Sequence, residues 1–449
     1  MSDEPTDGER YPTLTAAGQR MLDRLREHPS APIFRNRSGN RLTAQDVDIV
    51  RTFEAETLGA QVGWAARTIP DWTTDFVARV FEDVPYYRGL GSPPRRFEEL
   101  PTITRRDLSN DIARFVPDSV AVDRLINFRT TGTTGHPLLI ASHPRVAGCY
   151  LAFHKRALRR FGIELTYGSG QVGVILLGYQ RKCFTYVSVT PLMDESGLAK
   201  INLHPDDWRD AADRARYLDA MNPEVYAGDP ISFAELLTLP LTTRPKALIS
   251  VSMSLSSGLR QQIEVRFGCP VLDVYSMNEV GPVAVFDPAA GGHVLLQPHL
   301  FVELLDSSGR PVGAGERGEI TVTGGFNFCL PLLRYRTGDF GSLSFGADAP
   351  VIVGLSGRTP VRFRNQSGTW YNNIDISHAL AALPLSRYGL YQDGGAQLTL
   401  YLAPKELDST SAALAALKPL FGDQPIRVAT IGVEDKFVQY TSDMEGALL

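Results

Sequence analysis

This chain of 449 residues has few cysteines and little unbroken apolar sequence. Its four cysteines stand far apart, so the sequence predicts neither a disulfide framework nor a CxxC metal site and favours a reducing compartment. The longest apolar runs, such as Val172–Leu177, are far shorter than the about 18 residues that a membrane helix needs. The first residues, MSDEPTDGERYP, are acidic and polar where a signal peptide would be basic and then apolar. We therefore expect a cytoplasmic protein with no export signal and no membrane span.

Strong charge and the common metal and hydrolase motifs are also missing. The formal net charge of -5 gives no general attraction to nucleic acid or to anionic lipid. The eight histidines show no HxxxH or HExxH spacing, and no GxSxG elbow indicates a serine hydrolase. With 43% hydrophobic and 21% charged residues, the composition is that of a soluble globular protein, and the length allows two or three domains.

Apolar periodicity predicts a layered α/β fold. Helical spacing runs through Leu14–Arg26 and Ala44–Arg67, and from about residue 125 short β-branched runs alternate with helical patterns. The expected strands are Val172–Leu177, Ala247–Val251, Val271–Tyr275, Phe301–Leu305, Glu319–Val322 and Leu398–Leu402, and the expected helices include Trp208–Leu218, Ser256–Phe267 and Ala412–Phe421. We predict a helical lead-in (1–60), a large α/β domain with a small β-rich portion (61–356), and a small, mobile α+β C-terminal subdomain (357–449).

The segment Phe128–Pro137 carries the most chemical information. It contains Thr130, Thr131, Gly132, Thr133, Thr134 and Gly135 between two apolar runs. Glycines let a backbone bend close to a ligand, and threonine hydroxyls with exposed amides can donate to phosphate oxygens. The segment does not have the GxxxxGK spacing of a Walker loop, and a polar hairpin without a ligand is the alternative. A further predicted feature is a capping box from Thr104 to Asp107, which would start a helix.

Ordered matches extend this pattern over some 230 residues. The threonine-glycine segment resembles the phosphate loop of the adenylate-forming (ANL) superfamily of acyl-CoA synthetases and adenylation domains. Val274–Gly281 resembles that family's Tyr-Gly-x-Thr-Glu motif, Leu333–Asp339 its Tyr-Arg-Thr-Gly-Asp motif, and Gly357-Arg358 the pair that opens its C-terminal subdomain. Four more segments look most like the phenylacetate:CoA ligase branch: Val84–Arg88, Leu100–Leu108, Gly228–Ile231 and His299–Asp306.

The resemblance implies a role for each matching residue. The nucleotide set would comprise Thr130, Thr131, Gly132, Thr133, Thr134, Gly135, Tyr275, Ser276, Asn278, Glu279, Asp339 and Arg358. Within it the loop would hold the β- and γ-phosphates, Tyr275 would stack on adenine, Asp339 would accept hydrogen bonds from the ribose, and Glu279 would hold Mg2+. Lys436, Glu279 and Thr131 would act in catalysis, with Lys436 stabilising charge that develops in the transition state. Lys418 and Lys405 are poorer alternatives for this lysine, because their neighbours resemble helix or turn surface. The substrate wall would include Tyr179, Ser252, Ser254, Tyr275 and Gly281. Taken singly, each residue also has an ordinary structural alternative, such as a core tyrosine or a helix-capping glutamate.

Four positions depart from the family pattern. His136 replaces the usual lysine of the loop, which lowers the local positive charge, and Ser276 and Asn278 replace Gly and Thr or Ser. After Arg358 the chain continues with Thr359-Pro360, and a proline fixes φ near -65°. This proline restricts a joint that elsewhere swings between two poses.

The resemblance implies an ATP-dependent enzyme with Mg2+ and CoA as cofactors. A small or aromatic carboxylic acid would become acyl-AMP with release of pyrophosphate, and the acyl group would then pass to CoA. One alternative is transfer to a carrier-protein pantetheine or an amine, or activation of another oxyanion. Another is a non-catalytic nucleotide-binding module. We expect no nucleic-acid or membrane partner, and a homodimer is the common default for soluble enzymes.

Overall fold

The computed structural model describes residues 5–66, 68–129, 138–179, 183–313, 315–346, 349–356, 361–385, 387–431 and 438–447. The α-helices are α1 (Asp7–Arg10), α2 (Ala16–Glu27), α3 (Ala44–Gly59), α4 (Trp72–Asp83), α5 (Pro85–Arg88), α6 (Arg105–Asn110), α7 (Pro144–Arg160), α8 (Asp213–Met221), α9 (Pro230–Leu236), α10 (Ser257–Phe267), α11 (Asn373–Leu380) and α12 (Thr410–Phe421). Within these described stretches, no helix is both long and apolar enough to cross a bilayer.

The strands are β1 (Ile103–Thr104), β2 (Ile126–Arg129), β3 (Leu139–Ser142), β4 (Val172–Gly178), β5 (Tyr186–Thr190), β6 (Ser196–Asn202), β7 (Val225–Gly228), β8 (Ala247–Ser250), β9 (Val271–Met277), β10 (Gly281–Asp287), β11 (Gly292–Leu295), β12 (Leu300–Leu305), β13 (Arg317–Gly324), β14 (Leu332–Phe345), β15 (Pro350–Ser356), β16 (Arg362–Arg364), β17 (Trp370–Asn372), β18 (Tyr388–Gln392), β19 (Leu398–Leu402), β20 (Ile426–Thr430) and β21 (Tyr440–Ser442).

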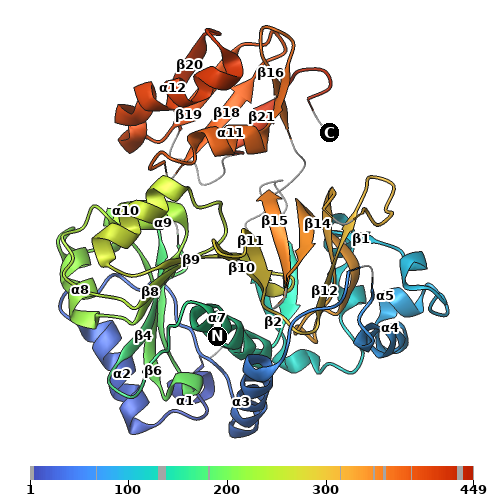
Figure 1. The fold of residues 1–449 in the computed structure, drawn as a ribbon. Helices are drawn as coiled ribbons and strands as arrows, with labels where there is room; N and C mark the ends of the chain where they lie inside the picture. Colours follow the sequence, from blue (N-terminus) through green and yellow to red (C-terminus); the bar gives the residue numbers. More distant parts are fainter. Residues whose placement is uncertain are drawn as a thin grey trace.

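One long curved sheet organises the larger part of the described chain (Figure 1). Its strand order is β12-β13-β14-β15-β11-β10-β9-β8-β7-β4-β6-β5, and β1 adds to β14. The run from β9 to β6 is parallel, whereas β9 to β15 and β12 to β14 pair antiparallel. The sheet therefore has a parallel half and an antiparallel half that meet at β9, in agreement with the predicted α/β layers and β-rich portion.

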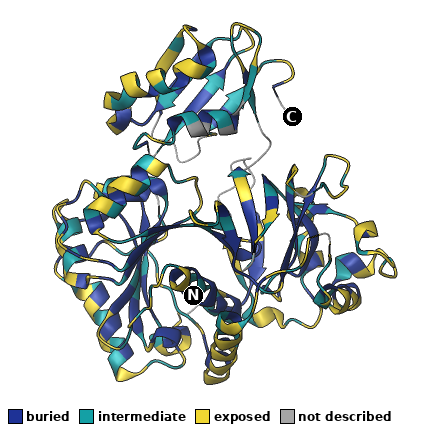
Figure 2. Ribbon diagram, in the orientation of Figure 1, coloured by how far each residue is buried: buried dark blue, intermediate teal, exposed yellow. Residues whose placement is uncertain are grey.

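The parallel half is covered on both faces, as parallel sheets require. Successive strand side chains point to opposite faces. Tyr226 and Leu248 pack into one core with α2, α8, α9 and α10, whereas Val225 and Ile249 pack into another with α7. Each fully buried apolar side chain of this size stabilises the fold by about 1.5–3 kcal/mol. Figure 2 shows the strands buried between exposed helix surfaces.

The helix α10 illustrates how local sequence sets the element ends. Ser256 accepts a hydrogen bond from the Leu259 amide as its N-cap, and Gly268 ends the helix at φ 69° in the left-handed region. The helix was expected at these residues, and the predicted strands at β4, β8, β9, β12, β13 and β19 are likewise confirmed. The Thr104–Asp107 capping box is present as well.

Two predicted helices are wrong at their ends. The helix expected over Ala44–Arg67 ends at Gly59, after which Ala60 is extended. The helix expected from Trp208 begins only at Asp213, because the Trp208 indole is buried and donates to the carbonyl of Asn202 (2.8 Å). In both cases the apolar spacing continues beyond the helix, but the chain leaves the helical conformation where the fold requires another backbone path.

A separate four-stranded sheet forms the C-terminal part, in the order β20-β19-β18-β21. It packs with α11 and α12 around its own core, which includes Phe363, Leu390, Leu400, Leu417 and Phe421. This α+β unit agrees with the predicted fold class. The predicted boundary at Gly357 lies outside the described residues, so the division into domains stays a prediction.

The N-terminus of α10 contacts this C-terminal unit directly. The Gly258 amide and the Ser257 hydroxyl both donate to the Ala381 carbonyl (3.0 and 2.6 Å), and the Ser256 hydroxyl donates to the Leu383 carbonyl (3.1 Å). A Cβ at Gly258 would lie 2.5 Å from the Ala382 carbonyl oxygen, so only glycine allows this approach.

Candidate active site

A hydrogen bond between two predicted site residues forms the centre of the candidate site. The Tyr275 hydroxyl, on β9, donates to Asp339 Oδ2, on β14, at 2.7 Å. Three strands lie between β9 and β14 in the sheet order, so the sheet must curve for these side chains to meet. Burial, and then the charge of Asp339, raise the pKa of Tyr275 well above its ordinary value. The hydroxyl therefore stays protonated and donates to the carboxylate.

A bulge in β14 turns Asp339 out of the ladder. Glu319 pairs with Phe340 and Thr321 with Arg336, so residues 337 to 339 have only Ile320 opposite them. The Thr337 hydroxyl donates to the Ile320 carbonyl (2.8 Å) and accepts from the Asp339 amide (3.1 Å). Gly338 has φ 79° and donates its amide to Glu319 Oε1 (3.0 Å). These contacts fix the backbone that presents the Asp339 carboxylate.

Glu279 lies in the turn between β9 and β10 and is 6% exposed. Its Oε1 accepts a hydrogen bond from the Tyr335 hydroxyl (3.0 Å) and lies 3.6 Å from Arg105 Nη1. Burial, and then the charge of Glu279, raise the pKa of Tyr335 well above its ordinary value. Tyr275, Glu279, Tyr335 and Asp339 form what we call the tyrosine–carboxylate cluster, in which each tyrosine donates to one carboxylate.

Arg105 reaches the cluster through a strand pairing that the sequence did not reveal. The short strand β1 pairs parallel with β14, placing Ile103 beside Tyr335 and Thr104 beside Arg336. Arg105 is the first residue of α6, whose start is fixed by Asp107 Oδ2, which accepts from the Thr104 amide and hydroxyl (both 2.7 Å). The capping box was visible in the sequence, but the partner of its strand was not. Sequence reasoning therefore assigned no role to Arg105, or to Tyr335 within its motif.

Gly281 places the backbone against an aromatic wall. Its φ is 74°, and a Cβ there would lie 2.6 Å from Phe326 Cε1 and 3.3 Å from Tyr150 Cε1. Phe326 packs against Tyr150 and Phe153, with ring centroids 5.2 and 4.9 Å apart. The buried side-chain amide of Gln297 donates to the carbonyls of Val280 and Pro282 (2.6 and 2.8 Å), which holds the turn. This wall consists of apolar and aromatic groups beside Glu279.

Other predicted site residues lie elsewhere. Tyr179 packs on the core of the parallel half, near His204 (ring centroids 5.8 Å apart) and Lys405 (Nζ 5.9 Å from the ring centroid). Ser252 (φ 73°) and Ser254 are exposed beyond β8. Among the described residues no hydrogen bond or ring contact joins these three to the tyrosine–carboxylate cluster. Ser276 is half-buried and Asn278 is exposed beside it.

The remaining predicted residues cannot be placed. Thr130, Thr131, Gly132, Thr133, Thr134 and Gly135, together with His136, lie outside the described residues, between β2 and β3. The same holds for Arg358, for Pro360, and for Lys436.

The residues present fit a magnesium ion only as part of a nucleotide complex. Within the described ranges there is no group of three or more His, Cys, Asp or Glu side chains able to hold an ion. Glu279 offers one carboxylate, and its contacts with Tyr335 and Arg105 both engage Oε1, so Oε2 is the oxygen that a cation would take. Mg2+ typically binds one or two carboxylates and completes its shell with water and substrate phosphates.

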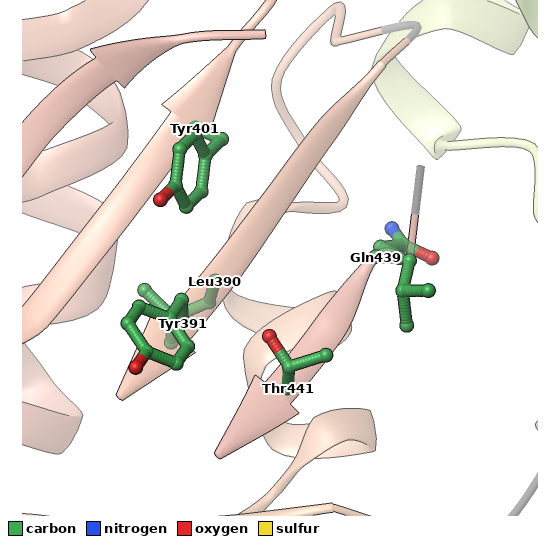
Figure 3. Close-up of a pocket in the computed structure, with 6 residues that line it drawn as sticks. Leu390, Tyr391, Tyr401, Gln439 and Thr441 are labelled. Carbon is green, nitrogen blue, oxygen red and sulfur yellow. The ribbon is translucent and has the colours of Figure 1, made fainter. Parts of the chain in front are cut away.

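A hollow of about 280 Å³ lies away from this cluster, on the C-terminal sheet (Figure 3). It is lined by Leu390, Tyr391, Tyr401, Val438, Gln439 and Thr441, none of which was predicted as a site residue. The Tyr391 hydroxyl donates to Asp443 Oδ2 (2.5 Å), a second tyrosine–aspartate pair of the same chemistry as Tyr275–Asp339. Nothing in this hollow indicates a ligand, but the pair provides a matched control.

Comparisons with known proteins agree with the motif order. No protein-family model matches the chain. The phenylacetate-coenzyme A ligase of Escherichia coli K12 is 25% identical over 294 residues, which cover 60% of this chain and 64% of that enzyme. The enzyme of the same name from Thermus thermophilus is 26% identical over 318 residues, or 64% of this chain and 66% of that enzyme. The chain thus spans just under two thirds of the length of these relatives.

Solved structures give the fold. A 2-hydroxyisobutyryl-CoA ligase in the postadenylation state, in complex with R3-HIB-AMP, superposes with a TM-score of 0.59 at 16% identity, covering 89% of this chain and 90% of that one. An open conformation of that ligase, in complex with 2-HIB-AMP and CoA, gives a TM-score of 0.51 over 81% of this chain and 88% of that one. These comparisons confirm the predicted resemblance: the chain is phenylacetate-CoA ligase-like in sequence and has the fold of the adenylate-forming superfamily.

Proposed function

We propose that the chain is an AMP-forming acid–thiol ligase, which activates a small or aromatic carboxylic acid as acyl-AMP and transfers the acyl group to CoA. The observation that carries the proposal is the tyrosine–carboxylate cluster. It joins the Glu279 motif to the Asp339 motif through side chains that are more than 50 residues apart in sequence. Similarity to two phenylacetate-CoA ligases supports the same chemistry.

In the first proposed step, a carboxylate oxygen of the acid attacks the α-phosphorus of ATP. The bond from that phosphorus to the bridging oxygen breaks, and pyrophosphate leaves. The Asp339 carboxylate, oriented by the hydrogen bond from Tyr275, would accept hydrogen bonds from the ribose hydroxyls. The Tyr275 ring would lie against adenine. A magnesium ion on Glu279 would supply positive charge to the phosphates. We propose that Thr131 with its neighbours grips the phosphates and that Lys436 stabilises the developing charge.

In the second proposed step, the CoA thiol loses its proton to solvent water and its sulfur attacks the acyl carbon. The bond from that carbon to the AMP oxygen breaks, and AMP leaves. The aromatic wall at Gly281, Tyr150 and Phe326 favours an acid with a flat or small apolar group. An apolar wall packs against such a group, whereas it offers no polar partner to a charged group on the substrate. We further propose that the enzyme acts in the cytoplasm, and that residues 1–60, 61–356 and 357–449 are its lead-in, its main domain and its moving subdomain.

Acid-dependent exchange of pyrophosphate into ATP tests the first step. The panel comprises aryl acids, short aliphatic acids and amino acids, and each acid that supports exchange is then tested for AMP release with and without CoA. We expect exchange with an aryl or small acid, and AMP release that depends on CoA. Exchange without a response to CoA would move the acceptor to a carrier protein or an amine. No exchange with any acid would overturn the proposal.

The Tyr391–Asp443 pair supplies the control for the site. Asp339→Asn should abolish most of the exchange, whereas Asp443→Asn removes the same charge from a similar pair outside the cluster and should leave exchange unchanged. Equal losses in both variants would mean that Asp339 supports only folding.

A further inference from the structure

We infer that the helical lead-in is a working part of the nucleotide site, because Asp46 on α3 holds both stems of the β2–β3 hairpin that carries the predicted phosphate loop. Asp46 would be a positioning residue, which acts through the hairpin and touches no substrate. The inference rests on the proposed function and extends it to a segment for which the sequence predicted only a helical lead-in.

The hairpin needs anchors outside itself. Strands β2 and β3 pair antiparallel from Ile126↔Ser142 to Arg129↔Leu139, and they form a two-stranded sheet separate from the large one. An isolated two-stranded hairpin is at best marginally stable in water. Leu138 and Ile140 anchor one face of the hairpin in the core of the antiparallel half. The contacts at its two stems then determine how the strands lie against the lead-in.

A single carboxylate from the lead-in reaches both stems. Arg124 comes just before β2, and its two terminal nitrogens contact the two oxygens of Asp46 at 2.8 Å (Nη2 to Oδ2) and 3.3 Å (Nη1 to Oδ1). Arg145 comes just after β3, and its Nε lies 3.6 Å from Asp46 Oδ1. The paired contact with Arg124 fixes geometry as well as charge, whereas Arg145 Nε makes no hydrogen bond within the described residues and interacts with Asp46 through charge alone. Figure 1 shows α3 beneath α7.

Asp46 is itself held rigidly. It is 4% exposed, and its Oδ2 accepts from the amide and the hydroxyl of Thr43 (2.9 and 2.8 Å) in the capping box that starts α3. Burial alone would raise the pKa of Asp46, but the hydrogen bonds from Arg124 and Thr43 outweigh it and lower the pKa to about 2. The carboxylate therefore stays charged at working pH. Arg124 is tied to the same region by a bond from its Nη2 to the Arg41 carbonyl (3.0 Å).

The opposite side of the hairpin is held independently. The Asn327 side chain donates to the Ala141 carbonyl on β3 (3.0 Å), and the Arg145 guanidinium lies 4.8 Å from the centroid of the Phe328 ring. The hairpin thus lies between the lead-in helix and the segment that follows β13. Loss of the Asp46 contacts would free the stems on the lead-in side while the other side stayed attached.

A second ion pair between α3 and α7 provides a control that distinguishes positioning of the hairpin from packing of the two helices. Glu54 on α3 and Lys155 on α7 are 2.7 Å apart and are also mostly buried, and in the described part of the chain no hydrogen bond or ion pair joins either of them to β2 or β3. Glu54→Gln therefore weakens the attachment of α3 to α7 without touching the stems. Asp46→Asn keeps the size of the side chain and removes the charge that Arg124 and Arg145 share.

The test compares these two variants in two assays. Hydrogen–deuterium exchange of peptides covering β2 and β3 needs no nucleotide, and we expect it to speed up severalfold in Asp46→Asn and to stay at the wild-type rate in Glu54→Gln. In the pyrophosphate exchange assay, KM for ATP should rise about tenfold in Asp46→Asn, the scale of one charge-assisted hydrogen bond. KM for the acid should change much less.

The outcomes are distinguishable from failure of the proposed function. Wild-type protein without acid-dependent exchange would overturn the ligase, while the hydrogen exchange comparison would still decide whether Asp46 holds the hairpin. Equal hairpin protection and equal KM for ATP in Asp46→Asn and Glu54→Gln would refute the inference. If Asp46→Asn does not fold, Arg124→Lys is measured instead, because it keeps the charge and loses the paired contact.

Discussion

Removal of one hydroxyl group tests the link between Tyr275 and the nucleotide. Tyr275→Phe keeps the aromatic ring and deletes the 2.7 Å hydrogen bond to Asp339. Hydrogen bonds to a charged group contribute about 1.5–3 kcal/mol. Since both side chains are only half-buried, we take the lower end, about 1.5 kcal/mol, which corresponds to about a tenfold effect. KM for ATP should therefore rise about tenfold, with little change in KM for the acid.

The assay is pyrophosphate exchange with ATP varied at a fixed, saturating acid concentration. If Tyr275 acts by orienting Asp339, the Tyr275→Phe change should have less than about a threefold effect once Asp339 is already Asn, because contacting residues are not additive. Tyr391→Phe, which deletes a hydroxyl from the similar Tyr391–Asp443 pair, is the control. The reasoning is refuted if Tyr391→Phe has the same effect, or if the two changes at the site multiply in full.

Four further predictions concern single side chains. Glu279→Gln should lower exchange by roughly 100-fold and shift the Mg2+ dependence to higher concentration, as a Mg2+ titration would reveal. Gly281→Ala, which places a Cβ 2.6 Å from Phe326, should cost about 1–3 kcal/mol of stability in thermal unfolding and raise KM for the acid. Lys436→Ala should reduce exchange on the order of 100-fold or more, and an unchanged rate would remove Lys436 from the catalytic set. Burial raises the pKa of Asp273 to about 6, so its favourable contribution is present below about pH 4 and is lost as the pH rises through 6. Asp273→Asn should therefore exceed the wild type in Tm at pH 8 and lose that advantage near pH 4, and a difference that is constant with pH would contradict this.

Much of the fold could be predicted because local sequence patterns determine many of its helices and strands. The strand β19 was predicted at its observed residues, and the helix predicted over Ser256–Phe267 is α10, which begins one residue later because Ser256 is its N-cap. Apolar periodicity and capping residues act within a few positions of one another, so the sequence displays them directly. The same local rule overextended the helix that ends at Gly59, since charged and apolar residues continue at helical spacing beyond it.

The site was predicted in part, for a reason that lies in its geometry. Tyr275, Glu279 and Asp339 were predicted because they belong to ordered motifs, and the structure brings them together, while their roles stay predictions. Arg105 was missed because only the parallel pairing of β1 with β14 brings it near Glu279, and a pairing between residues more than 200 positions apart leaves no local signal. Asp46 was missed for the same reason, since its contacts with Arg124 and Arg145 depend on how α3 packs.

We propose that the contact between α10 and the C-terminal unit opens and closes during turnover. Among the described residues it includes hydrogen bonds from Ser256, Ser257 and Gly258 to the backbone carbonyls of Ala381 and Leu383. Each such hydrogen bond contributes only about 1 kcal/mol net, because water replaces the partner when it breaks. The Lys405 ammonium, 5.9 Å from the Tyr179 ring centroid, adds a cation–π contact of similar size. Tyr179 lies at this contact, and its predicted role in the substrate wall stays a prediction. A two-step ligase would have to change the placement of the C-terminal unit between its steps.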